Sequence, residues 1–108
     1  MDVFIQQRAH VESAPDGAQA WTLLQTVRYD LILTDHRMPV MTGLELVRRI
    51  RGQAMDVPIL LTSGFGLEGQ EDSLRKDPRL RLVPKPFTVA TLLRHASELL
   101  ATAQASGG

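Results

Sequence analysis

The chain lacks cysteine and long hydrophobic runs, and these absences exclude several classes of protein. Without cysteine, its 108 residues form neither a disulfide nor a thiolate metal site, which suits a reducing compartment. No apolar run approaches ~18 residues, so no transmembrane helix is expected. The amino terminus shows neither the basic region nor the cleavage pattern of a signal peptide. We therefore expect a cytoplasmic protein without a membrane partner.

An excess of charge of one sign is missing too. Twelve basic and twelve acidic residues give a formal net charge of zero, so the composition does not indicate a nucleic-acid partner. Lysine is scarce, because Lys76 and Lys85 are the two lysines among the twelve basic residues. The length predicts one domain. We place it at residues 1–102 and interpret residues 103–108 as a disordered tail.

Short apolar runs alternate with amphipathic stretches along the sequence. Expected strands lie near residues 10–14, 30–35, 57–62 and 80–84, and expected helices near 17–28, 43–52, 67–76 and 88–102. This alternation predicts parallel strands joined by right-handed crossovers, with helices on both faces of the sheet. The fold class is therefore α/β, with an open, doubly wound parallel sheet.

Three of the expected strands end in side chains that carry chemistry: Asp35, Thr62 and Lys85. In an open α/β sheet the carboxyl ends of the strands form the edge where ligands bind. We therefore predict that the three side chains converge there, within reach of one bound phosphate. Taken singly, each residue has a plainer interpretation: a turn aspartate before Pro39, a strand-ending threonine and a solvated lysine. Pro86 directly follows the lysine and is a candidate for a cis peptide bond.

The chemistry of the three groups suits phosphoryl transfer. A carboxylate at a strand end can attack phosphorus and become an acyl phosphate. A hydroxyl at position 62 can donate to a phosphoryl oxygen, and an ammonium at position 85 can neutralise the group. The order of the three residues, each followed by a helix, is far more specific than any one of them.

The sequence resembles the receiver domain of bacterial two-component response regulators. The resemblance covers nearly the whole chain and is carried by residues 30–39, 41–46, 60–64 and 84–87, with 13–20 matching the second strand and the turn after it. It implies a flavodoxin-like fold and a phosphorelay module whose partner is a sensor histidine kinase or a phosphotransfer protein.

The resemblance also implies a role for five positions. Asp35 corresponds to the phosphoacceptor, Thr62 to the hydroxyl that reorients toward the phosphoryl group, and Lys85 to the lysine that pairs with it. Ser63 corresponds to the residue whose backbone N–H contacts a phosphoryl oxygen. Arg37 corresponds to the residue whose backbone carbonyl binds Mg²⁺ beside the carboxylate of Asp35.

One departure from the family pattern bears on the metal. Receivers open with a central strand that ends in an acidic pair, and here residues 2–8 are interpreted as the end of a helix instead. The first β-strand is thus expected to be missing, together with the acidic pair. Mg²⁺ needs near-octahedral oxygen ligation, so we expect weak or absent Mg²⁺ binding and little phosphorylation by acetyl phosphate.

The missing strand also predicts an assembly problem, because one edge of the strand at 30–35 is left unpaired. Each buried unpaired backbone group costs about 1–3 kcal/mol. We therefore expect either a homodimer or a markedly low stability.

Three functions remain open, and in the leading one the chain is a non-enzymatic phosphoacceptor receiver that signals through protein contacts. In the second it is a pseudo-receiver, which lacks Mg²⁺-dependent phosphorylation and acts only as an interaction module. A phosphatase of the haloacid-dehalogenase type is disfavoured, because that class needs an acid two residues after its nucleophile, where Arg37 stands. The histidines His10, His36 and His95 show no metal spacing and are expected at the surface.

Overall fold

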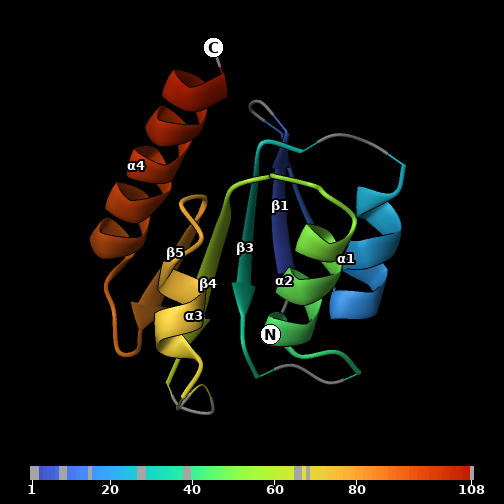
Figure 1. The fold of residues 1–108 in the computed structure, drawn as a ribbon, viewed down its shortest axis with the longest axis horizontal. Helices are drawn as coiled ribbons and strands as arrows, with labels where there is room; N and C mark the ends of the chain where they lie inside the picture. Colours follow the sequence, from blue (N-terminus) through green and yellow to red (C-terminus); the bar gives the residue numbers. More distant parts are fainter. Residues whose placement is uncertain are drawn as a thin grey trace.

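A computed structural model of the chain describes residues 3–7, 10–14, 16–26, 29–37, 40–64, 67 and 69–107, with the backbone alone at 3–7, 10–13 and 102–107. The elements in chain order are β1 Val3–Gln7, β2 His10–Ala14, α1 Gly17–Leu24, β3 Leu31–Asp35, α2 Gly43–Gly52, β4 Ile59–Ser63, α3 Glu71–Arg75, β5 Leu80–Pro84 and α4 Val89–Gly107 (Figure 1). The four strands predicted from the sequence are present, within two residues of their expected bounds.

The strands form one sheet with the spatial order β2-β1-β3-β4-β5. β3 pairs in parallel with β4, and β4 in parallel with β5, as predicted. β1 runs antiparallel to both of its neighbours, β2 and β3. The sheet is therefore mixed, and its parallel part comprises β3, β4 and β5.

Our prediction that residues 2–8 end a helix is wrong, because Val3–Gln7 form strand β1. In its register with β3, Phe4 pairs with Leu33 and Gln6 pairs with Leu31. β1 occupies the central place that a parallel strand fills in the family pattern, but it runs in the opposite direction. The edge of β3 is thus paired within the chain, which removes the premise of the expected dimer or low stability.

Both faces of the parallel strands carry apolar side chains, and helices cover both. Ile32, Ile59 and Leu61 belong to the core cluster on the side of α1, α2 and α3. Leu60 and Val83 belong to the cluster packed under α4. Successive residues of a strand point to opposite faces, so strands that are covered twice are apolar at nearly every position.

Side-chain caps mark the start of α1 and of α2. Asp16 caps α1, where its Oδ1 accepts a hydrogen bond from the backbone N–H of Gln19 at 2.9 Å. Thr42 and Glu45 form a capping box at the start of α2. The hydrogen bonds from the backbone N–H and the hydroxyl of Thr42 hold the pKa of Glu45 below its ordinary value. These caps fix where α1 and α2 begin, directly after the loops at the carboxyl edge.

Three helices differ from their predicted bounds. α1 ends at Leu24, earlier than the expected residue 28, and α3 is only Glu71–Arg75. α4 continues to Gly107, beyond the expected end near residue 102. A domain boundary at residue 102 stays a prediction. Among the helices that the structure describes, none is long and apolar enough to cross a membrane.

Candidate functional site

The side chains of Asp35, Thr62 and Lys85 meet at the carboxyl edge of the parallel strands, as predicted. Asp35 ends β3 and is 5% exposed. Its Oδ1 accepts a hydrogen bond from Thr62 Oγ1 at 3.1 Å, and its Oδ2 accepts one from Lys85 Nζ at 2.9 Å. The buried carboxylate is thus held by a hydroxyl on one oxygen and an ammonium on the other. Its charge is compensated inside the protein, as a buried charge requires.

The register of the sheet explains this convergence. Asp35 lies beside Thr62 in the pairing of β3 with β4, and Ser63 lies beside Pro84 in the pairing of β4 with β5. The backbone N–H of Lys85 donates to the carbonyl of Ser63 at 2.9 Å, which continues the ladder by one residue. The peptide bond between Lys85 and Pro86 is cis. Lys85 therefore projects from a backbone that is fixed to β4.

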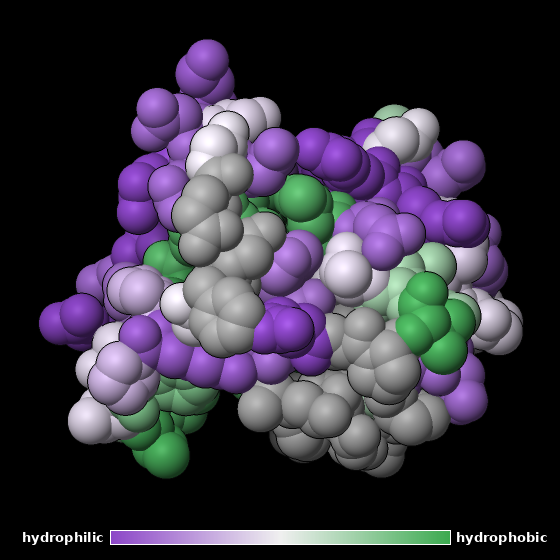
Figure 2. Space-filling model, turned by 90° about the horizontal axis from the view of Figure 1, so that it is seen from below, coloured by the Kyte–Doolittle hydropathy of each residue, from purple (hydrophilic) through white to green (hydrophobic). Residues whose placement is uncertain are grey.

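The two charged partners differ in their access to solvent. The side chain of Lys85 is 33% exposed, whereas that of Asp35 is 5% exposed. Figure 2 views the molecule from this edge, where hydrophilic surface covers most of the described middle and hydrophobic surface forms separate patches. An anion that approaches the edge would meet a cation with a buried carboxylate behind it.

The two remaining positions named by the resemblance lie at the same edge. Ser63 is the last residue of β4 and is buried. Arg37 lies in the loop after β3 and is exposed. The structure thus gathers four of the five residues on consecutive strand ends, and the fifth in the loop that leads to α2.

The expectation that His36 lies at the surface is wrong, because the residue is buried beside Asp35. Its backbone N–H donates to Asp35 Oδ1 at 3.1 Å. Its ring Nδ1 accepts a hydrogen bond from the backbone N–H of Leu44 at 3.4 Å. The available signal was its place directly after Asp35, at the end of a strand whose residues are mostly buried.

The described residues do not fit the Mg²⁺ ion that the resemblance implies. Both oxygens of Asp35 already accept hydrogen bonds. Within the described part of the chain, no three His, Cys, Asp or Glu side chains are grouped to hold a metal. Asp16 follows β2, which is separated from β3 by β1, and its carboxylate caps α1. Because Mg²⁺ needs near-octahedral oxygen ligation, one carboxylate that is already engaged is a poor site for it among the described residues.

Comparisons with known proteins point to one family. The family described as the response regulator receiver domain matches residues 1–97. Sensor protein EvgS of Escherichia coli K12 is 39% identical over 90 residues, which are 82% of this chain and 7% of EvgS. A chemotaxis protein CheY homolog of Campylobacter jejuni is 31% identical over 100 residues, which are 90% of this chain and 77% of that protein.

A solved structure shares the fold. The receiver domain of the Francisella response regulator 1452 superposes with a TM-score of 0.70 at 28% identity, over 82% of this chain and 73% of that one. The parallel strands β3, β4 and β5, with helices on both faces, match this flavodoxin-like architecture. The chain belongs to the response regulator receiver domain family of two-component signalling.

Proposed function

We propose that the chain accepts a phosphoryl group on Asp35 and signals by protein contact in its modified form. The donor would be a phosphohistidine on a sensor histidine kinase or a phosphotransfer protein, the classes with which receiver domains interact. One observation carries this proposal. The carboxylate of Asp35 is buried at the ligand-binding edge and contacts a hydroxyl on one oxygen and an ammonium on the other.

The transfer would form one bond and break one. An oxygen of the Asp35 carboxylate forms a bond to phosphorus while the P–N bond of the phosphohistidine breaks. The electron pair of that bond stays on the imidazole nitrogen of the donor, which then takes a proton from solvent. The product is an acyl phosphate on Asp35. On this proposal the chain is a substrate of its kinase rather than an enzyme.

The neighbours of Asp35 would stabilise the transferred group. Lys85 brings a positive charge on a partly exposed side chain. Its ammonium group can move from the carboxylate to a phosphoryl oxygen. The hydroxyl of Thr62 can turn from Asp35 Oδ1 to donate to another phosphoryl oxygen. The backbone N–H of Ser63 at the end of β4 is a candidate third donor. Positioning and charge stabilisation of this kind supply most of the catalysis in phosphoryl transfer.

The test is phosphate uptake followed by intact mass. The chain is incubated with a phosphorylated histidine phosphotransfer domain or with acetyl phosphate, each with Mg²⁺ and with EDTA. We expect a mass gain of one phosphoryl group from the protein donor and slower uptake from acetyl phosphate. Asp35→Asn should abolish the gain, and Asp72→Asn, an exposed aspartate of α3, should not. Unchanged uptake by Asp35→Asn would overturn the proposal.

A pseudo-receiver is the second candidate, and the metal chemistry favours it. The described residues offer no cluster that could hold a metal, and both oxygens of Asp35 are engaged. In that case the chain acts as an interaction module whose state does not change with phosphate. A folded chain that gains no mass from either donor, with or without Mg²⁺, would establish this function over the first.

A further inference from the structure

The amino terminus of α2 has all four of its free backbone donors satisfied, which is a complete cap. A helix leaves the first four N–H groups without intrahelical partners. The capping box takes two of them, since Thr42 N donates to Glu45 Oε1 at 3.2 Å and Glu45 N to Thr42 Oγ1 at 3.2 Å. His36 takes the other two. Gly43 N donates to its carbonyl at 2.8 Å, and Leu44 N donates to its ring Nδ1 at 3.4 Å.

The same histidine is tied to the candidate acceptor. Its backbone N–H is shared between the Thr62 carbonyl at 2.9 Å and Asp35 Oδ1 at 3.1 Å. One residue therefore links the end of β3, the end of β4 and the start of α2. The position of the Asp35 carboxylate thus depends on where α2 holds this peptide.

The packing around Gly43 makes the link rigid. A Cβ atom at this position would lie 2.6 Å from the Asp35 carbonyl oxygen and 2.9 Å from His36 Cα. The first residue of α2 therefore rests directly on the peptide that joins Asp35 to His36. A shift of α2 along its axis would move the acceptor with it.

The ring of His36 has a defined tautomer in this arrangement. It is 9% exposed, and its Nδ1 accepts from the Leu44 N–H. A ring nitrogen can accept a hydrogen bond only where it carries no proton, so the ring proton sits on Nε2. An asparagine places its Oδ1 acceptor at the same distance from the backbone as Nδ1, whereas leucine offers none.

We propose that His36 is a positioning residue for Asp35, and that its ring, by capping α2, holds the acceptor carboxylate in register with Thr62. The inference deepens the proposed function and rests on it for its kinetic consequence. His36 touches no transferred group and acts through the backbone of Asp35 and the first turn of α2.

The experiment compares three variants of the full chain. His36→Leu removes the ring acceptor, His36→Asn restores it, and Thr42→Ala weakens the same helix end without touching the bonds of His36. We expect His36→Leu to slow phosphate uptake about tenfold, as for the loss of one hydrogen bond. His36→Asn should stay within about twofold of the parent rate. Equal slowing by Thr42→Ala and His36→Leu would overturn the proposal, because helix stability alone would then explain it.

A second readout does not depend on phosphate. In ¹⁵N and ¹³C spectra, the parent chain should show the Nε2–H tautomer at His36. The carboxyl carbon of Asp35 should shift in His36→Leu and stay in place in His36→Asn and Thr42→Ala. A proton on Nδ1 in the parent chain would overturn the proposal. If the parent takes up no phosphate, the proposed function fails, and these spectra still decide whether His36 positions Asp35.

Discussion

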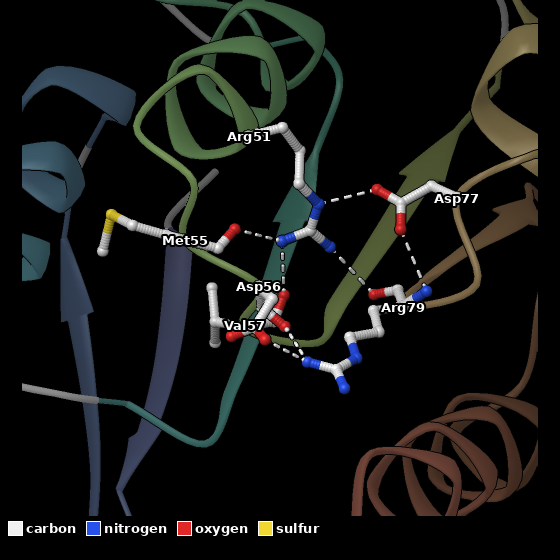
Figure 3. Close-up of polar contacts among 6 residues, drawn as sticks. All are labelled: Arg51, Met55, Asp56, Val57, Asp77 and Arg79. Carbon is white, nitrogen blue, oxygen red and sulfur yellow. Dashed lines mark hydrogen bonds and ion pairs between the residues drawn. The ribbon is translucent and has the colours of Figure 1, made fainter. Parts of the chain in front are cut away.

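The carboxyl and amino edges of the parallel strands each hold an aspartate paired with a basic residue, and the pairs are built differently. At the carboxyl edge Lys85 makes one hydrogen bond to Asp35, at 2.9 Å. At the amino edge Arg51 donates to Asp77 at 2.6 Å and also to three backbone carbonyls (Figure 3). Those carbonyls belong to Met55 at 2.8 Å, Val57 at 2.9 Å and Arg79 at 3.2 Å.

The Lys85–Asp35 pair rests on one bond and can exchange its partner, whereas the bonds of Arg51 cross-link the fold. A guanidinium offers five donors in a fixed plane, while an ammonium is a compact charge on a flexible stem. Arg51 uses its fork to join the end of α2, the loop before β4 and the loop before β5. Arg79 adds a contact across the same loops, to the carboxylate of Asp56. Lys85 holds one carboxylate and can be drawn to an incoming anion.

The largest expected effect tests the cross-link at the amino edge. Arg51→Met removes one donor from each of three carbonyls and from the half-buried Asp77. The Arg79 carbonyl still accepts from the N–H of Ile59, and Asp77 still accepts from the N–H of Arg79. We expect the free energy of unfolding to fall by about 3 kcal/mol, in the range for breaking a partly buried charged network. Urea unfolding measures this change, provided that the free energy of unfolding falls with urea concentration at the same slope in both proteins. Lys85→Met should cost less, since Asp35 keeps its bonds from Thr62 and from the backbone of His36.

Two controls sharpen that comparison. Arg49→Met, on an exposed position of the same helix, should change stability by less than about 0.5 kcal/mol. Arg51→Lys keeps the charge and loses the fork, so it should recover less than half of the lost stability. Full recovery by lysine would show that charge, and not the planar set of donors, holds the amino edge together.

The second effect concerns the glycines at the two ends of α2. Gly43→Ala places a Cβ 2.6 Å from the Asp35 carbonyl and 2.7 Å from Leu61 Cδ1, so the backbone must shift. We expect a loss of about 2 kcal/mol, as for overpacking in a tight core. Gly52→Ala meets no atom within 4 Å and should raise stability by about 0.5 kcal/mol. Thermal melting of both variants decides, and a neutral Gly43→Ala would contradict the close contact between α2 and Asp35.

Much of the parallel part of the sheet could be predicted from the sequence, because its strands are apolar at nearly every position and its helices carry local start signals. The same strands end at Asp35, Thr62 and Lys85, and parallel topology alone brings their ends together. β1 could not be predicted in this way. Residues 3–7 form a strand because they pair with the edge of β3, which lies far away in the sequence.

Two polar contacts also escaped prediction for a physical reason. The cap that His36 gives to α2 spans eight residues, and its ring contact joins the end of β3 to the first turn of α2. Arg51 reaches the carbonyl of Arg79 in the loop before β5, 28 residues along the chain. Neither contact has a periodic pattern, since each depends on loops whose course is set by the packing of the whole domain.

The third effect compares backbone strain at the two edges. Val40, in the loop before α2, has φ 69° and is 79% exposed, and Ala54, after α2, has φ 59°. Ala54 stands where helices that end in a Schellman motif favour glycine, since Met55 N donates to Ile50 O and Ala54 N to Arg51 O. We expect Val40→Gly and Ala54→Gly each to raise stability by about 1 kcal/mol, with the larger gain at the β-branched valine. A loss at Val40 would mean that its exposed side chain stabilises the loop at the carboxyl edge.

The smallest effect concerns a third charged cluster, which lies between β5 and α4. His95 Nδ1 lies 3.0 Å from an Arg81 guanidinium nitrogen, and Arg81 also pairs with Glu98 at 2.8 Å. Burial, and then the charges of Arg81 and Arg94, hold the pKa of His95 below its ordinary value, and Glu98 opposes them only in part.

This lowered pKa gives the cluster a pH dependence of known sign. Below about pH 6.5 the unfolded chain binds a proton at this histidine that the folded chain resists. Stability should therefore fall as the pH drops from about 7 toward 5. His95→Gln should flatten that fall by less than about 1 kcal/mol, measured by urea unfolding at each pH. Parallel curves for the two proteins would show that the ring titrates as freely in the fold as in the unfolded chain.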